Sequence, residues 1–252
     1  MMDIQFITFL NDAERNFSGW DFSYVTETGR LQTGTAAWSY GSTVIPYIRG
    51  ADTMLDMGTG GGELLSNLRP FPKSIYATEG FAPNVQVARE RLEPLGVIVE
   101  VVDEDEVLPF PDQFFDLVIN KHESYSPLEV RRVLKDGGYF ITQQVGGSDS
   151  ADINRALGVP VNDEFADWNL ESASAGLLEN GFQIIRSEED APVQRFYDIG
   201  ALIYYLSAIP WQVPGFHPDK YRDELYRVHQ EIQENGYLEV KQSRFIILAR
   251  AV

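Results

Sequence analysis

Glycines at alternate positions of one short segment are the residues best suited to hold a ligand. Gly58, Gly60 and Gly62 follow an apolar run, and Asp56 stands just ahead of them. Glycine lets the main chain turn sharply and leaves room for a ligand against bare backbone. A dinucleotide fingerprint needs glycine at the sixth position, but Glu63 stands there, and its carboxylate would meet a pyrophosphate. The loop therefore favours a ligand without phosphates.

Acidic residues follow the next two apolar runs. Glu79 lies 21 positions after Gly58, the spacing at which an acidic side chain reaches the two ribose hydroxyls of an adenosine. Asp103 and Glu104 open an acidic stretch after the third run, where one carboxylate is placed to meet the adenine amino edge. Because the carboxyl ends of parallel strands share one edge of a sheet, these groups are expected to line one crevice.

Short β-branched runs that alternate with helical segments predict a parallel sheet with crossover helices. Strands are expected at residues 53–57, 74–78, 97–102, 114–120, 139–145, 182–186 and 245–249. Helices are expected at residues 63–68, 83–94, 126–134 and 171–180, and two more at about 198–207 and 219–233. The helix that begins at Pro83 is expected to turn Val87, Leu92 and their neighbours toward the sheet.

The helix near residue 126 has clear signals at both ends. Ser126 and Glu129 stand in the register of a capping box, with Pro127 at the first helical position. Gly137 and Gly138 are expected to close this helix after its last apolar residue.

Four motifs together identify a family. They are LDMGTGGG at residues 55–62, ATEG at 77–80, LPFPDQFFDLVIN at 108–120 and RRVLKDGGYFI at 131–141. In this order and spacing the chain resembles a class I S-adenosylmethionine-dependent methyltransferase. The resemblance implies an α/β, Rossmann-like, seven-stranded and mostly parallel sheet, with helices on both faces and an antiparallel last strand.

The same resemblance implies S-adenosylmethionine as the cofactor and a set of residues around it. The glycine loop would surround the methionine moiety, Glu79 would bind the ribose, Asp103 or Glu104 would lie near adenine, and Asn120 would stand at the transfer site. The cofactor-binding residues expected on this basis are Tyr40, Asp56, Gly58, Thr59, Gly60, Gly62, Glu79, Asp103, Glu104 and Asn120.

Two residues after Lys121 are candidates for catalysis. His122 and Glu123 follow the fourth predicted strand of the sheet, and a histidine with its usual pKa near 6.5 could act as a general base there. Packing under a loop is an equally good interpretation of His122. Tyr40 has two interpretations as well, because an aromatic ring before the first strand could cover the sulfonium or belong to the core.

Composition limits the classes of partner. The chain of 252 residues has 20 Lys and Arg against 38 Asp and Glu, which gives a net charge of −18. Nucleic acid and anionic membranes are therefore unexpected partners, and a neutral or cationic acceptor is favoured. With no cysteine and three scattered histidines, no metal site is expected. No targeting or membrane-spanning segment stands out, so we expect a cytoplasmic protein.

We interpret residues 1–252 as a single methyltransferase domain. Residues 51–188 and 243–252 would form its cofactor-binding core, with an N-terminal cap segment at 1–50 and an inserted cap at 189–242 that would serve as a substrate lid. The expected reaction is direct S_N2 methyl transfer to a small-molecule acceptor. A non-catalytic S-adenosylmethionine-binding module and a nicotinamide-dependent oxidoreductase stay open as alternatives.

Overall fold

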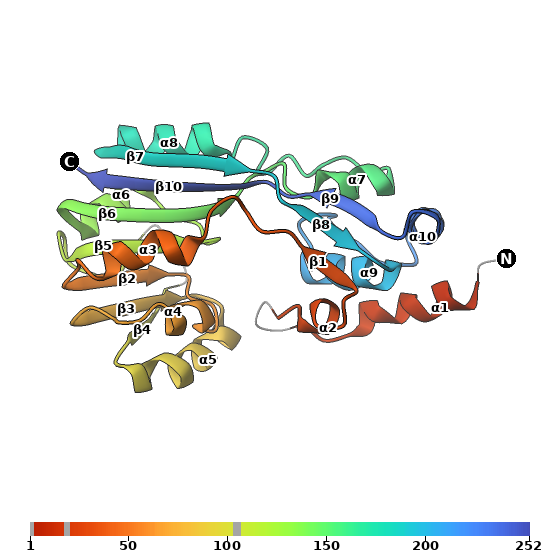
Figure 1. Cartoon of the computed structure of the whole chain (residues 1–252), viewed down its shortest axis with the longest axis horizontal. Coiled ribbons are helices and arrows are strands. Elements are labelled where there is room, and N and C mark those ends of the chain that lie inside the picture. The colour runs from red at the N-terminus through yellow and green to blue at the C-terminus, as the bar shows by residue number, and fades with distance from the viewer. Residues whose placement is uncertain (1–2, 18–20, 103–106) are drawn as a thin grey trace. The chain divides into compact units, whose positions relative to one another are not determined.

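The chain divides into two compact units, and the computed structural model describes residues 3–17, 21–102 and 107–252 (Figure 1). The large unit consists of Ala37–Val145, Trp168–Glu189 and Arg244–Val252. The small unit consists of Met1–Ala36, Gly146–Asp167 and Asp190–Ser243. The large unit thus begins ahead of the first predicted strand, and the small unit takes in residues 146–167 in addition to the N-terminal and inserted segments.

A seven-stranded sheet forms the centre of the large unit. Its strand order is β4-β3-β2-β5-β6-β10-β7; β2, β3, β4, β5 and β6 pair in parallel, and β10 pairs antiparallel with β6 (Figure 1). The strands are β2 (Thr53–Met57), β3 (Ser74–Glu79), β4 (Ile98–Val101), β5 (Phe115–Lys121), β6 (Leu134–Val145), β7 (Phe182–Asp190) and β10 (Arg244–Ala251). This confirms the Rossmann-like sheet with an antiparallel last strand.

Helices flank this sheet, and they are α3 (Tyr40–Ile48), α4 (Glu63–Asn67), α5 (Ala82–Leu92), α6 (Pro127–Val133) and α8 (Leu170–Glu179), with a 3₁₀ turn, η2 (Glu93–Leu95), after α5. Leu55, Val118 and Phe140 are register partners on neighbouring strands, so their side chains share one face. They are fully buried in one cluster with Val130 of α6 and Leu177 of α8. The middle strands are thus covered, which explains why they are almost continuously apolar.

The face of α5 differs from the prediction. Val87 is 42% exposed, whereas Val85, Ala88 and Leu92 are buried. Residues 85, 88 and 92 recur at helical spacing, and position 87 is turned about 100° away from position 88. The expectation that Val87 faces the sheet was therefore wrong.

The ends of α6 also differ from the prediction. Ser126 accepts a hydrogen bond from the Glu129 N–H, but the Glu129 carboxylate pairs with Arg132 at 2.5 Å and accepts the Leu108 N–H at 2.6 Å. The reciprocal half of the capping box is thus replaced by a contact that anchors the preceding loop.

The glycine pair does not cap this helix. Helix α6 ends at Val133 and β6 begins at the next residue, so Gly137 and Gly138 lie inside the strand. Gly137 has a φ of 79°, and the register between β5 and β6 shifts at this place. The glycines therefore form an irregularity within β6. Glycine is typical both of a helix end and of a strand bulge, so the residue type alone does not distinguish the two.

The small unit combines a short antiparallel sheet with helices. The strands β1 (Leu31–Thr33), β8 (Val193–Phe196) and β9 (Leu238–Lys241) pair in the order β1-β8-β9. The helices are α1 (Ile4–Leu10), α2 (Ser23–Thr26), α7 (Ala151–Leu157), α9 (Ile199–Ala208) and α10 (Arg222–Asn235), with a 3₁₀ turn, η1 (Asn11–Glu14), after α1. Helix α9 is almost wholly buried, so the apolar run expected to form a helix is the core of this unit.

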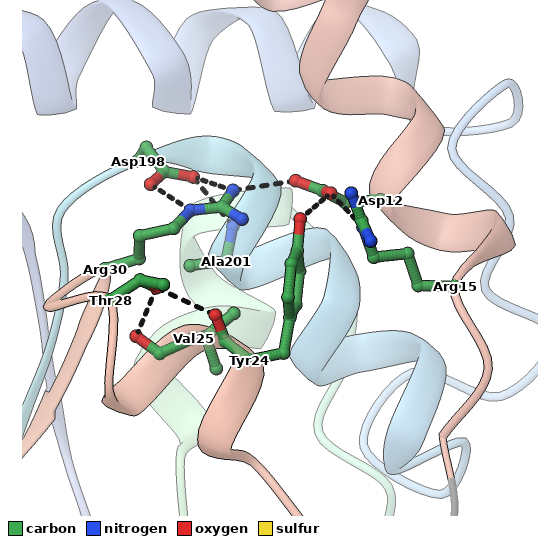
Figure 2. A network of polar contacts seen from close by, with 8 residues as sticks. All are labelled: Asp12, Arg15, Tyr24, Val25, Thr28, Arg30, Asp198 and Ala201. Atoms are coloured by element: carbon green, nitrogen blue, oxygen red, sulfur yellow. Dashed lines mark hydrogen bonds and ion pairs between the residues drawn. The ribbon is translucent and has the colours of Figure 1, made fainter.

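A network of charged groups ties the small unit together, as Figure 2 shows. The Arg30 guanidinium donates to Asp12 at 2.7 Å and to Asp198 at 2.6 and 2.7 Å, and the Tyr24 hydroxyl donates to Asp12 at 2.7 Å. Asp198 also caps α9 by accepting the Ala201 N–H. The network therefore joins η1, α2 and β1 to the start of α9.

Within the described ranges, no helix is long and apolar enough to cross a bilayer.

Candidate functional site

The glycine loop joins β2 to α4 and has the left-handed backbone that its sequence requires. Gly58, Gly60 and Gly62 have φ values of 63°, 62° and 79°. At Gly62 a Cβ would lie 2.7 Å from Leu92 Cγ, so a side chain does not fit against α5. At Gly60 a Cβ would meet nothing within 4 Å. The loop is therefore closed on the side of α5 and presents open main chain at Gly60.

Glu79 ends β3 beside this loop. Its side chain is buried, its Oε1 accepts the Phe81 N–H at 2.8 Å, and the Gly60 and Gly80 N–H groups also face it. Burial raises the pKa of the Glu79 carboxyl, and these hydrogen bonds oppose the rise. The adjacency to Gly60 that the spacing predicts is thus present in the structure.

Asp56 is the second buried carboxyl of the site. Burial raises its pKa to about 7, Glu79 adds repulsion, and the nearby Thr59 hydroxyl and Lys121 ammonium oppose the shift. Burial, and after it the charge of Asp56, raises the pKa of the Tyr40 hydroxyl well above its usual value. Two buried carboxyls in a low dielectric favour a cationic ligand.

The side chain of Asn120, near the end of β5, is engaged by neighbouring residues. Its side chain is fully buried; its Oδ1 accepts hydrogen bonds from Thr142 at 3.1 Å and Gln144 at 2.7 Å, and its Nδ2 donates to the Ser124 carbonyl. Its main-chain carbonyl accepts the Tyr40 hydroxyl at 3.1 Å. The structure therefore brings Tyr40 to the end of β5 through the backbone, while the amide of Asn120 holds strands β5 and β6 together.

His122 is held by a relay of hydrogen bonds. The Trp38 indole N–H donates to Gln143 Oε1 at 2.8 Å, so the Gln143 amide must donate to His122 Nε2 at 2.9 Å. Desolvation, together with the charges of Arg244 and Lys121, lowers the pKa of His122 to about 3. A histidine with so low a pKa is a weak base, and its Nε2 already accepts a hydrogen bond, so both features argue against His122 as the general base.

Glu123 is placed directly against the glycine loop. A Cβ at Gly58 would collide with the Cβ, Cγ and carboxylate of Glu123, so the absence of a side chain at Gly58 makes room for it. Its Oε1 also accepts the Ser124 N–H at 3.3 Å. Of the two catalytic candidates, Glu123 is the one that contacts the predicted cofactor loop.

Asp103 and Glu104, the residues expected near adenine, lie outside the described residues.

Sequence reasoning missed Lys121 and Arg244, whose charges both act on His122. The two-residue period of β5, which puts Lys121 on the same face as Ile119, could have indicated Lys121. In the part of the chain that the structure describes, no group of three or more His, Asp and Glu side chains could hold a metal ion.

Known proteins resemble both the sequence and the fold. A family model described as a methyltransferase domain matches residues 55–142. Malonyl-(acyl-carrier protein) O-methyltransferase from Marinomonas sp. is 28% identical over 79% of this chain and 80% of that protein. A Mycobacterium ulcerans protein, named phthiotriol/phenolphthiotriol dimycocerosates methyltransferase 2, is 32% identical over 56% of this chain and 50% of that protein.

The fold is shared with solved structures at lower identity. A Bacillus halodurans protein inferred to be a methyltransferase matches 83% of this chain and 97% of its own chain, with a TM-score of 0.58 and 18% identity. At that identity the match speaks for the fold, whereas the family model covers the glycine loop, Glu79 and β5 themselves.

Proposed function

We propose that this chain, a class I S-adenosylmethionine-dependent methyltransferase, methylates a small-molecule acceptor by direct S_N2 transfer. The observation that carries the proposal is the meeting of open main chain at Gly60 with two buried carboxyls, Glu79 and Asp56. These groups fit a ligand that has hydroxyl donors at one end and positive charge at the other. S-adenosylmethionine supplies a methyl group on a positively charged sulfur.

The cofactor roles follow the order of the strands. Glu79 accepts hydrogen bonds from the ribose hydroxyls, and the main chain of residues 58–62 lies along the methionine moiety. Asp56 and the ring of Tyr40 lie on the side where positive charge is held. Roles for Asp103 or Glu104 at adenine and for Asn120 at the transfer site stay predictions.

Rate enhancement in this proposal comes from alignment and from exclusion of water. A nucleophile that is already ionised needs no proton acceptor, which agrees with the low pKa of His122. Glu123, against Gly58, is placed to orient the acceptor or to take its proton. Unchanged turnover in His122→Ala would agree with a positioning role, and a loss of about 10²-fold or more would restore His122 as the base.

The acceptor is proposed to be a small molecule, with neither nucleic acid nor membrane as partner. The Marinomonas relative is named for O-methylation of a malonyl group, which makes a carboxyl oxygen one chemical option for the acceptor atom. The proposals of a cytoplasmic location and of a lid formed by residues 1–50 and 189–242 come from the sequence alone. Fractionation of cells checks the first, and a variant of the small unit described below checks the second.

Binding and turnover test the proposed function together. S-adenosylmethionine and S-adenosylhomocysteine are expected to raise the unfolding temperature. At a ligand concentration of 100 times Kd the free energy of unfolding should increase by about 2.7 kcal/mol, while NAD and NADP should have no effect. A mass-detected screen of small acceptors should then show transfer of one methyl group. Stabilisation by NAD alone would favour an oxidoreductase, and binding without transfer to any acceptor would favour a non-catalytic module.

A further inference from the structure

Charged side chains form a row across the sheet of the large unit, at the carboxyl ends of β3, β2 and β5. Asp56 is the register partner of Ala77 on β3 and of Ile119 on β5. Glu79 and Lys121 each stand two residues further along those strands. Because register partners share a face and strand side chains alternate with a period of two, these three side chains lie on the same face.

The row continues onto β6 and β10. Lys121 is the register partner of Gln143, which in turn pairs with Ile246 of the antiparallel strand β10. Arg244 stands two residues before Ile246, toward the same edge of the sheet, so it shares their face. The order across the face is therefore Glu79, Asp56, Lys121, Gln143 and Arg244.

The charges of this row are separated by sign. Two carboxyls occupy the β3 and β2 end, where the cofactor loop lies, and two cations occupy the β5 and β10 end. The charge of Arg244 acts on Lys121. Burial is the larger cause of the lowered pKa of Lys121, Arg244 lowers this pKa as well, and Asp56 opposes the shift. In a chain with a net charge of −18, this is a local concentration of positive charge.

The described neighbours of Lys121 do not neutralise its positive charge with an ion pair. Among the described residues, no carboxylate forms an ion pair with the half-buried Lys121 ammonium. Glu123 lies against Gly58, and the Gln143 side chain is hydrogen-bonded to Trp38 and His122. His122 is neutral at physiological pH and adds no negative charge.

We propose that the acceptor carries a carboxylate or phosphate group, which is bound by Lys121 with help from the field of Arg244. The inference rests on the proposed methyl transfer and specifies its substrate class, in place of the neutral or cationic acceptor that net charge favours. An anion next to a desolvated ammonium makes a charge-assisted hydrogen bond and recovers the energy lost on burial. Asp56 and Glu79 repel an anion, so the end of the row with Lys121 and Arg244 is the favoured place for it.

Matched acceptors test the charge requirement. The wild-type enzyme is offered carboxylic acids with their primary amides, and phosphomonoesters with their parent alcohols, together with deuterated S-adenosylmethionine. Transfer to the anionic member of a pair should exceed transfer to its neutral partner by about tenfold or more. Comparison of the two kinds of pair distinguishes carboxylate from phosphate. Equal transfer to neutral or amine acceptors would overturn the proposal.

Variants test the role of Lys121. Lys121→Met should raise the KM of the anionic acceptor by about 10- to 100-fold, and Lys121→Arg should restore most of this loss. Binding of acetate and inorganic phosphate, titrated into enzyme saturated with S-adenosylhomocysteine, should weaken in parallel for the anion that is preferred. Lys73→Met is the control, because Lys73 is 85% exposed and pairs with Asp52 elsewhere on the large unit.

Failure of this inference differs from failure of the proposed function. If S-adenosylhomocysteine binds and methyl transfer occurs, but Lys121→Met leaves KM and anion binding unchanged, the anionic acceptor is wrong and the methyltransferase stands. If neither S-adenosylhomocysteine binding nor transfer to any acceptor is found, the proposed function and the inference that rests on it both fall.

Discussion

Glu79 combines burial with a position beside open main chain, and this makes it the most informative single residue of the cofactor site. Glu79→Ala should weaken S-adenosylmethionine binding by about 1.5–3 kcal/mol, because hydrogen bonds to a charged group are lost. Calorimetry measures the change, and Glu93→Ala on the exposed turn after α5 is the control. Equal affinity in Glu79→Ala and wild type would reduce Glu79 to a structural acid of the loop.

Asp56 should make cofactor binding depend on pH. Its pKa of about 7 means that the carboxyl is largely protonated at pH 6 in the free enzyme, whereas a cationic ligand favours the ionised form. S-adenosylmethionine should therefore bind about tenfold more weakly at pH 6 than at pH 8. Asp56→Asn should bind weakly and with little pH dependence, and an equal slope in both proteins would assign the titration to another group.

Asp56 should also make the stability of the ligand-free protein depend on pH, with stability falling as the pH rises. The folded-state pKa of Asp56 lies above the usual aspartate value of 3.8, so the folded state retains a proton that the unfolded state loses. Its contribution to stability is present below about pH 4 and is lost as the pH rises to about 7. Asp56→Asn should thus stabilise the ligand-free protein at pH 8, by at most about 4 kcal/mol, and change little at pH 4.

Residues close together in the sequence were predictable, and residues joined by strand pairing were not. The glycine loop and Glu79 belong to motifs of fixed spacing, so their types and positions indicated their surroundings. Lys121 and Arg244 act on the same ring although one ends β5 and the other begins β10, far apart in the sequence and outside the motifs. Their meeting depends on the register of β5, β6 and β10, which no local pattern specifies.

At the scale of elements, the loop between β2 and α4 should distinguish strain from ligand contact. Gly60 and Gly96 both have positive φ, and a Cβ at either would meet nothing within 4 Å. Alanine at each position should therefore cost a similar amount of stability, about 1 kcal/mol. Gly60→Ala should also weaken S-adenosylmethionine binding by about 10- to 100-fold, because its Cβ projects into the space assigned to the ligand.

Thermal unfolding and calorimetry on the two variants separate these effects. Gly96 follows the turn η2, away from the motif, and serves as the matched control. If both variants bind S-adenosylmethionine like the wild type, the open main chain at Gly60 is not the ligand surface. If Gly60→Ala alone fails to fold, the loop is needed for the sheet itself.

Elements with strong periodicity were predicted well, and those that depend on tertiary contacts were not. Strands β2 and β5 and the helices α9 and α10 lie close to their expected ranges because their apolar runs are long and bounded by turn or capping signals. Strand β1 has three residues and is completed by pairing with β8, more than 160 positions later. Gly137 and Gly138 were misassigned because local sequence does not distinguish a helix stop from a bulge.

At the scale of the whole molecule, the net charge of −18 predicts partners less well than the placement of charge does. The excess of acid disfavours nucleic acid as a bulk partner. It gives no information about a row of side chains on one face of the sheet whose two ends have opposite charge. A local field acts over a few ångströms in a low dielectric, while solvent screens the distant surface carboxylates beyond about 10 Å.

The small unit can be weakened without touching the large one, which tests whether it serves as the lid. Arg30→Met removes the cation that Asp198 and Asp12 share in the network of Figure 2, and leaves Asp12 with only the more exposed Arg15. Removing one partner of such a network should destabilise the small unit by about 3–5 kcal/mol. Arg195→Met is the control, because its ion pair with Glu239 is about 40% exposed and should contribute at most about 1 kcal/mol.

Hydrogen exchange and activity together decide the outcome for the lid. Arg30→Met should speed exchange in α9 and β1, leave S-adenosylmethionine affinity within about twofold of wild type, and lower methyl transfer because water reaches the reacting groups. Full activity alongside rapid exchange in the small unit would refute the lid. A matching loss of cofactor affinity would show instead that the sheet of the large unit depends on the small unit for its own folding.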